Sequence, residues 1–123
     1  MEIRPLTHVD INSMWDINEQ GLPGTGKVSL EEIGHLLDIS ELALGVYEGE
    51  KLLGFVLCLL PKMHYGSLNY AWFNERYEQF IYVDRIAVRT NSRDRGVGSL
   101  LYREVINYSE KHDVMITAEV SLK

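Results

Sequence analysis

The residues best suited to chemistry lie close together, where two arginines directly precede two glycines. Residues 93–98 read Arg-Asp-Arg-Gly-Val-Gly, and a serine follows. Glycine leaves the backbone open to close approach by a ligand, and arginine carries positive charge with donors suited to phosphate. Backbone N–H groups gathered at a helix start also bind anions. The pattern therefore predicts that a phosphorylated small molecule contacts Arg93, Asp94, Arg95, Gly96, Val97, Gly98 and Ser99.

A strand and a helix flank this stretch and must hold it in place. Residues 82–88 are largely apolar, which predicts a mostly buried strand. After the glycines, Leu101, Val105 and Tyr108 recur at helical spacing, which predicts an amphipathic helix. Strand, glycine-rich turn and helix in this order direct the free N–H groups of the helix start toward an anion.

This arrangement resembles the core motif of the GNAT family of acetyl-CoA-dependent N-acetyltransferases. The family pattern is Arg or Gln, two residues, Gly, one residue, then Gly or Ala, and residues 93–98 fit it without a gap. The chain is also similar over nearly its whole length to a bacterial subgroup of predicted GNAT enzymes, through Trp72-Phe73, Arg76-Tyr77 and residues 82–86. The resemblance implies transfer of an acetyl group from acetyl-CoA to the primary amine of a small molecule or peptide.

The resemblance also implies how acetyl-CoA, or CoA, lies on the protein. Backbone N–H groups of residues 93–99 would surround its pyrophosphate, and its pantetheine arm would pair like an extra strand with Ile86, Ala87 and Val88. A backbone N–H there would face the thioester oxygen, where one such donor contributes about 3 kcal/mol in a transition state.

A base is required as well, because an alkyl amine is protonated at neutral pH. Asp84 and Tyr82 lie two positions apart on the predicted strand and share one face, so they are the first catalytic candidates, as base or substrate anchor. Glu119 on the last predicted strand is a second candidate base. Asp84 is also next to Arg85, and a purely structural ion pair is the alternative.

Residues 62–80 are unusually aromatic for a segment this polar. Two interpretations stay open: the rings pack beneath the sheet, or some of them line a small-molecule pocket. Tyr70, Trp72 and Phe73 are the candidates for contact with the acceptor substrate. A short helix is expected around residues 70–77.

Residues 21–27, Gly-Leu-Pro-Gly-Thr-Gly-Lys, match the first seven positions of a nucleotide-binding P-loop. The eighth position is Val28 instead of Ser or Thr, and the residues before Gly21 have a polar, helical pattern where a P-loop needs a buried strand. We therefore expect a loop between two helices that lines the substrate side, with nucleotide binding as a remote alternative.

The pattern along the chain predicts a mixed α/β (α+β) fold in one domain over residues 1–123. Thr7 and Ser29 are placed to cap two helices, each with an acidic residue three positions on. The element order is β-α-α-β-β-β-α-β, which is the GNAT order of a mostly antiparallel sheet flanked by helices. Strands are predicted over residues 3–6, 42–47, 52–60, 82–88 and 113–120. Helices are predicted over residues 9–19, from Leu30, and after the glycines through Leu101, Val105 and Tyr108.

The GNAT resemblance implies a further helix and two strands after residue 120. We therefore expect a C-terminally incomplete fold, in which either further residues or a homodimer completes the sheet edge. The helix implied by the resemblance commonly carries the tyrosine that protonates the departing thiol, so no residue is assigned that role. A non-catalytic CoA-binding module of the same fold is the alternative function.

Composition narrows the partners and the compartment. The 123 residues carry a net charge of −6, which argues against nucleic acid as a partner. The longest apolar run, residues 52–60, is too short to cross a membrane, and no signal peptide is recognised, so we expect a cytoplasmic protein. Cys58 is the single cysteine and is expected in the core. No spacing of His, Cys or carboxylate residues suggests a metal site.

Overall fold

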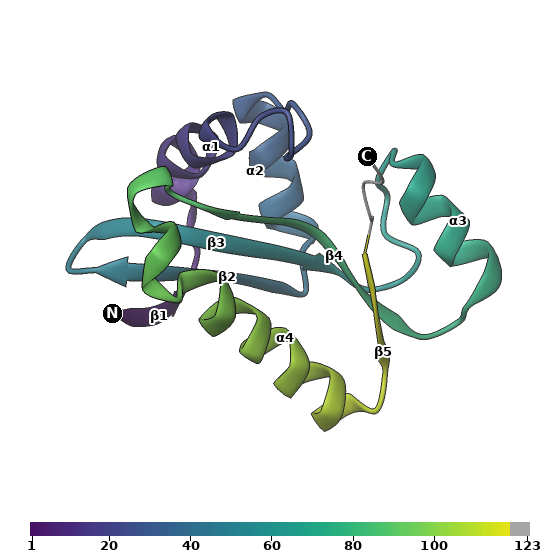
Figure 1. Ribbon diagram of the computed structural model, residues 1–123. Helices are drawn as coiled ribbons and strands as arrows, with labels where there is room; N and C mark the ends of the chain where they lie inside the picture. The colour runs from purple at the N-terminus through teal and green to yellow at the C-terminus, as the bar shows by residue number, and fades with distance from the viewer. Residues whose placement is uncertain (119–123) are drawn as a thin grey trace.

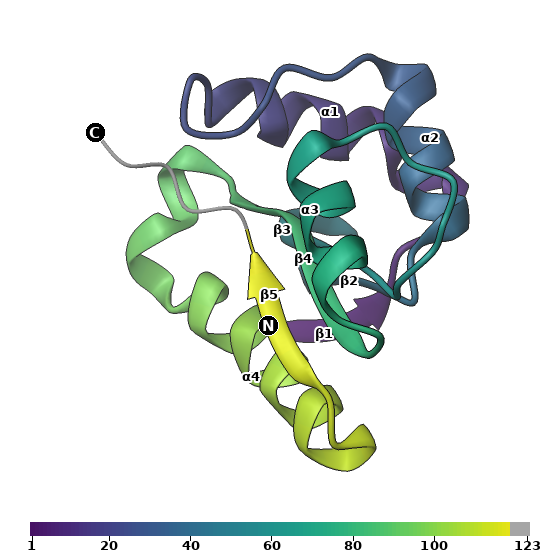
Figure 2. The same cartoon turned by 90° about the vertical axis from the view of Figure 1, so that its right-hand side faces the viewer.

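The computed structural model describes residues 1–118 as a five-stranded sheet with helices on both faces (Figures 1 and 2). The strands follow one another in space as they do in sequence, and the first four are antiparallel while β5 is parallel to β4. The strands are β1 (Glu2–Pro5), β2 (Leu42–Glu48), β3 (Lys51–Leu59), β4 (Phe80–Val88) and β5 (Met115–Ala118). This mixed sheet confirms the predicted fold class.

Helices fill the connections. Two of them, α1 (Ile11–Gln20) and α2 (Leu30–Ile39), cover one face of the sheet, and α4 (Val97–His112) covers the other (Figures 1 and 2). One helix, α3 (Leu68–Arg76), is inserted between β3 and β4, where the predicted element order had none and a short helix was expected around residues 70–77. Two 3₁₀ turns precede α1 and α4, at His8–Asp10 and Thr90–Arg95.

The start of α2 is set by local sequence. The backbone N–H of Glu32 donates to Ser29 Oγ at 3.0 Å, and the N–H of Ser29 donates to Glu32 Oε1 at 3.1 Å. These reciprocal bonds satisfy two N–H groups that the helix cannot pair internally. They also lower the pKa of the Glu32 carboxyl group, because they favour its charged form.

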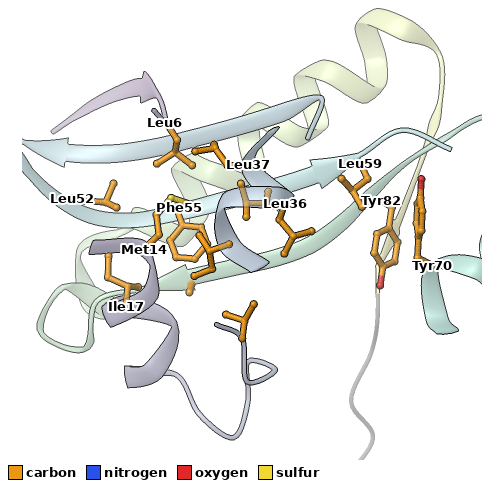
Figure 3. Close-up of a cluster of buried hydrophobic side chains, with 14 of the residues drawn as sticks. Leu6, Met14, Ile17, Leu36, Leu37, Leu52, Phe55, Leu59, Tyr70 and Tyr82 are labelled. Carbon is orange, nitrogen blue, oxygen red and sulfur yellow. The ribbon is translucent and has the colours of Figure 1, made fainter. Parts of the chain in front are cut away.

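Two apolar layers hold the sheet between its helices. Every residue of β3 after Lys51 is buried, as expected for a central strand packed on both faces. Cys58 is fully buried within it, so the prediction of a core cysteine is confirmed. Figure 3 shows the layer beneath α1 and α2, which includes Leu6, Met14, Ile17, Leu36, Phe55 and Leu59. The layer beneath α4 includes Val46, Val56, Val97, Leu101 and Val105.

Strands β4 and β5 pair over only part of their length. The register joins Phe80–Val83 to Met115–Ala118, whereas β3 accompanies β4 as far as Val88. Figure 1 shows β5 turned away from the direction of β4. Within residues 1–118, the side of β4 that faces away from β3 is therefore left without a strand partner beyond Val83.

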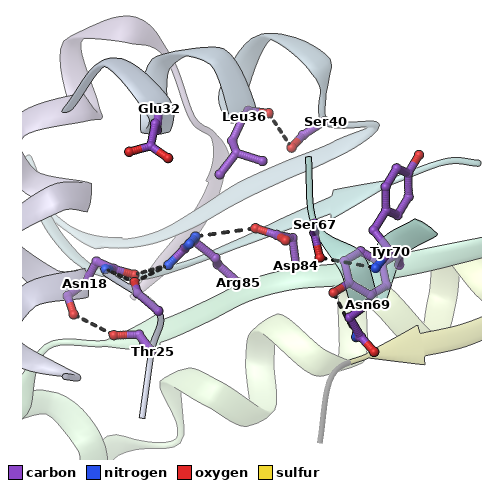
Figure 4. A network of polar contacts seen from close by, with 12 residues as sticks. Asn18, Thr25, Glu32, Leu36, Ser40, Ser67, Asn69, Tyr70, Asp84 and Arg85 are labelled. Carbon is purple, nitrogen blue, oxygen red and sulfur yellow. Dashed lines mark hydrogen bonds and ion pairs between the residues drawn. The ribbon is translucent and has the colours of Figure 1, made fainter. Parts of the chain in front are cut away.

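A β-bulge interrupts β4 at the same place. Arg85 is opposite Leu57 and Val83 is opposite Cys58, so Asp84 is the extra residue. The bulge resets the alternation of side chains: Val83 and Ile86 belong to the layer beneath α4, while Asp84 and Arg85 both lie on the side of α1 and α2 (Figure 4). Strict alternation would have placed these two neighbours on opposite faces.

The close approach of α4 to β3 leads to a stability prediction. A Cβ atom at Gly54 would lie 2.8 Å from Val97 Cγ1 and 2.9 Å from the backbone oxygen of Ala87, whereas one at Gly66 would meet nothing within 4 Å. We expect Gly54→Ala to lower the free energy of unfolding by about 1–3 kcal/mol through overpacking. Gly66→Ala, the matched control, should change it by less than about 1 kcal/mol. Urea unfolding of both variants measures this, and equal stabilities would contradict the packing described.

Candidate active site

A cleft of about 460 Å³ opens beside the unpaired part of β4. Its walls come from β4, from the loop between α1 and α2, from the segment before α3, and from α4. The lining residues are Pro23, Gly24, Thr25, Gly26, Tyr65, Ser67, Val83, Asp84, Arg85, Ile86, Tyr102 and Ala118. The bulge therefore directs a carboxylate and a guanidinium into this cleft.

A second hollow of about 440 Å³ adjoins the first and shares Gly24, Thr25, Ile86 and Tyr102 with it. It continues along β4 to the start of α4. Its lining residues are Gly21, Gly24, Thr25, Ile86, Ala87, Val88, Arg93, Gly98 and Tyr102. Five of the residues predicted to bind the cosubstrate, Ile86, Ala87, Val88, Arg93 and Gly98, thus line one hollow that reaches the first turn of α4 and adjoins the cleft of Asp84.

The first turn of α4 has backbone donors to offer. Gly96 is its N-cap, with φ of 78° and no side chain that could cap the helix. The first bond within the helix runs from Leu100 N–H to Gly96 O at 3.1 Å, so the N–H groups of residues 97–99 precede the internal bonding of the helix. A Cβ at Gly96 would meet nothing within 4 Å, and one at Gly98 would come only as near as 3.9 Å to Val88 Cγ2. The space suits an anionic group held by backbone N–H groups.

The two predicted phosphate-binding arginines differ in their contacts. Arg93 donates from Nε to Val88 O and from Nη2 to Gln20 O, each at 3.3 Å, and so ties the end of β4 to the end of α1. Arg95 forms two bonds to the carboxylate of Glu48, and this exposed pair lowers the pKa of the Glu48 carboxyl group. Arg93, which lines the second hollow, is therefore the better placed cation.

The remaining predicted phosphate contacts lie apart from the lining of both hollows. Asp94 is exposed in the turn before α4, and Ser99 is exposed in the first turn. Val97 is fully buried and packs in the core beneath α4, so its side chain anchors the helix and only its backbone N–H can serve a ligand. Within this motif, any contact beyond Arg93 and Gly98 is expected through the backbone.

The carboxylate of Asp84 interacts with the charged side chain of Arg85 and the aromatic side chain of Tyr65. Arg85 Nε lies 3.4 Å from Asp84 Oδ2, and the two side chains are 12% and 6% exposed. Burial, together with the charge of Asp84 and a hydrogen bond to it, raises the pKa of Tyr65. The Tyr65 hydroxyl therefore stays protonated at physiological pH and can donate into the cleft. The structure thus forms the predicted ion pair and also places its carboxylate on the cleft wall.

Tyr82, the other catalytic candidate, lies deeper. Its side chain is 1% exposed, and its hydroxyl accepts a hydrogen bond from Asn69 Nδ2 at 3.1 Å. Its ring contacts Tyr70 and Phe73. It shares the α1–α2 side of the sheet with Asp84, as predicted. Asp84 lines the cleft, however, whereas Tyr82 packs against the rings of Tyr70 and Phe73.

The three residues predicted to contact the acceptor occupy different environments on α3. Tyr70 is 1% exposed, and its hydroxyl bonds to Leu60 O and to the N–H of Met63. Phe73 is half-buried against the same core. Trp72 is 44% exposed, with the guanidinium of Arg76 over its ring. The placement of Tyr70 and Phe73 favours packing roles, and the aromatic residues on the cleft wall are Tyr65 and Tyr102.

The glycine-rich loop between α1 and α2 lines both hollows. It follows a helix, α1, where a P-loop follows a strand, and α2 begins only at Leu30. This context rules against a nucleotide-binding P-loop and agrees with the expected loop on the substrate side. Sequence reasoning did not single out Thr25, Tyr65 or Tyr102 as cleft residues, although Thr25 lies in the loop expected on the substrate side and Tyr65 in the aromatic segment. It named Arg85 only as the ion-pair partner of Asp84 and as one of several clustered arginines.

Residues 1–118 contain neither a cluster suited to a metal ion nor a helix suited to crossing a membrane. No cluster of three or more His, Cys, Asp or Glu side chains there is placed to hold a metal ion. No helix in the same range has the length and apolar character needed to cross a membrane. Glu119, the second candidate base, lies outside the described residues.

Comparisons with known proteins give one family. Residues 11–122 match the model of the acetyltransferase (GNAT) family, and a search of curated proteins finds no match. An aminoglycoside 6′-N-acetyltransferase of Acinetobacter haemolyticus superposes with a TM-score of 0.72 at 14% identity, covering 100% of this chain and 81% of that one.

Two further solved structures are similar to the chain. A possible acetyltransferase of Clostridium difficile 630 gives a TM-score of 0.73 at 14% identity, with 99% of this chain and 80% of that one covered. A transcriptional regulator of Bacillus halodurans C-125 gives 0.71 at 14% identity, with 98% and 81% covered. At such identities these likenesses show a shared fold and nothing about activity.

The burial of Cys58 and the nearby charge of Asp84 predict that the Cys58 thiol reacts slowly in the folded protein. Burial and the charge of Asp84 raise the pKa of this thiol to about 12, and only the thiolate reacts readily with disulfide reagents. At pH 8 the folded protein should therefore release almost no thionitrobenzoate from Ellman's reagent, whereas the chain in urea should react at one thiol. Fast labelling of the folded protein would contradict the burial described.

Proposed function

Because the chain belongs to the acetyltransferase (GNAT) family, we propose that it transfers an acetyl group from acetyl-CoA to a primary amine in the cleft beside β4. One observation carries the proposal. Two adjoining hollows extend from the buried carboxylate of Asp84, along the unpaired side of β4, to the uncapped first turn of α4. Such a space suits an extended ligand with phosphate at one end and a reactive group at the other.

The first turn of α4 is the proposed phosphate site. The N–H groups of Val97, Gly98 and Ser99 and the dipole of a 16-residue helix favour an anion there. The guanidinium of Arg93 lines the adjoining hollow and adds positive charge. The arm of the cosubstrate is proposed to lie along Ile86, Ala87 and Val88, where β4 has β3 on one side and no strand on the other within the described residues.

Acetyl-CoA supplies the acetyl group as an activated thioester. In the transfer, a C–N bond forms, the C–S bond breaks, the amine loses a proton and the sulfur gains one. A backbone N–H of β4 near Ile86 is the proposed donor to the thioester oxygen, since β5 does not pair with that part of the strand within the described residues. Asp84 is the proposed anchor or base for the amine, because its carboxylate can attract an ammonium group and accept its proton.

The acceptor is proposed to be a primary amine, and the fold alone does not identify which one. One relative of similar fold acetylates aminoglycosides, so an amino sugar belongs in a panel with polyamines, amino acids and peptides. A non-catalytic CoA-binding module is the second candidate, since one protein of similar fold is described as a transcriptional regulator. Turnover separates the two.

The phosphate site can be tested with two glycines that share a strained backbone. Gly96 and Gly49 have φ of 78° and 61°, and a Cβ at either meets nothing within 4 Å. A side chain costs about 1 kcal/mol of strain at each position, but only at Gly96 would it occupy the proposed phosphate space. We expect Gly96→Glu to abolish CoA binding in calorimetric titration and Gly49→Glu to retain it. Equal affinity of both variants would refute the site.

The activity can be tested by following free thiol while the amine panel is screened with acetyl-CoA. We expect at least one amine to release CoA, and Asp84→Asn to lower that rate by about a hundredfold while CoA affinity changes by less than about twofold. The control is Asp38→Asn, which should keep full activity. Asp38 is an exposed carboxylate on α2 that pairs with His8, in the turn before α1. CoA binding without turnover of any amine would favour the non-catalytic module, and an active Asp84→Asn variant would remove Asp84 from the mechanism.

A further inference from the structure

We infer that Arg85 is a positioning residue that fastens the α1–α2 loop to β4 and thereby forms the acceptor end of the cleft. The inference rests on the proposed function for its catalytic consequence, but the fastening itself is a property of the fold. Arg85 thus has two roles: it holds residues 21–28 in place as a wall of the cleft, and it holds the Asp84 carboxylate in position.

The bulge makes this possible. Because Asp84 is the extra residue of β4, Arg85 lies on the same side of the sheet as Asp84 and points toward α1 (Figure 4). An unbulged strand would turn it into the apolar layer beneath α4. The side chain is 12% exposed, so most of its length is enclosed between β4 and the loop.

Three hydrogen bonds converge on the loop. Arg85 Nη1 donates to Gly26 O at 2.6 Å and to Asn18 Oδ1 at 3.0 Å. Asn18 Nδ2 donates to the same Gly26 oxygen at 2.9 Å. Asn18, on α1, is fully buried, and its backbone oxygen accepts from Thr25 Oγ1 at 2.7 Å. The loop is therefore held at Thr25 and Gly26 by groups from α1 and β4, and Trp15 Nε1 on α1 also donates to Val28 O at 3.0 Å.

The same guanidinium faces the candidate catalytic group. Its Nε lies 3.4 Å from Asp84 Oδ2, and Gly26, Arg85 and Asp84 line one cleft. A planar guanidinium can meet a carboxylate with one edge and loop acceptors with another, which the single ammonium group of lysine cannot do. The position of the wall and the position of the carboxylate are thus set by one side chain.

The test compares Arg85→Lys with the parent. Amide hydrogen exchange in residues 21–28 should accelerate at least about tenfold, the size expected from losing a hydrogen bond to a charged group. The N–H of Thr25, which bonds to Gly21 O at 3.1 Å, is the reporter. In the acceptor assay, KM for the amine should rise by at least about tenfold, while the dissociation constant of CoA stays within about twofold.

Arg4→Lys is the matched control. Arg4 also donates to a loop carbonyl, that of Gly49 in the β2–β3 turn, from the opposite edge of the sheet. Its replacement should leave both the exchange of residues 21–28 and the acceptor KM unchanged. A loss confined to Arg85→Lys therefore reports the cleft and not a general effect of replacing arginine.

Gly26→Val approaches the same contact from the loop and keeps every charge. A Cβ there would already be in contact with Arg85 Nη2, at 3.4 Å, so the further Cγ atoms of valine should displace the guanidinium and loosen the loop in the same direction. This variant decides the matter if Arg85→Lys does not fold. The inference is overturned if both folded variants keep the parent's exchange rates. If exchange accelerates but no amine is acetylated by the parent, the proposed function fails while the fastening stands; if exchange accelerates and the acceptor KM is unchanged, the catalytic role of Arg85 fails.

Discussion

Strand β4 is bonded to β3 as far as Val88 but to β5 only as far as Val83, and this partial pairing is the constraint on which the site depends. A fully paired strand would have no open backbone beside its apolar core, and the space from Asp84 to α4 would be filled by a neighbour. The bulge at Asp84 comes where the pairing with β5 ends in the described residues. The early end of the β5 pairing thus leaves the cleft open, and the bulge in the ladder with β3 directs polar side chains into it.

The tight packing of α4 completes the arrangement. Because Gly54 carries no side chain, the first turn of α4 lies directly against β3, with Val97 in the core and Gly96 at the cap. The backbone donors of that turn therefore stand at the end of the same strand that carries Asp84. The distance between the proposed phosphate site and the proposed reacting site is set by the length of β4 from Asp84 to Val88, which is rigid because β3 supports it along that length.

Low sequence identity together with a shared fold has a physical explanation here. The features that shape the cleft are mainly backbone features: an open strand side, a bulge and a helix start. Many side-chain sets can support them, so acetyltransferases and a protein described as a transcriptional regulator superpose on this chain at 14% identity. Side chains on the cleft wall, such as Tyr65 and Arg85, are where we propose that the acceptor is recognised.

The sequence by itself determined the strands, most of the helices and the glycine-rich turn that is proposed to bind phosphate, because these follow from local chemistry. Apolar periodicity, the Ser29–Glu32 capping pair and the Arg93–Gly98 pattern each act over a few residues, and the family match over residues 11–122 agrees with them. Tertiary structure alone decided the bulge at Asp84, because an extra residue in a ladder is visible only against its partner strand. It also decided that Arg85 meets Asn18 and Gly26, residues 67 and 59 positions away in the chain. No pattern in one segment encodes such a contact, since it exists only when β4, α1 and the loop pack together.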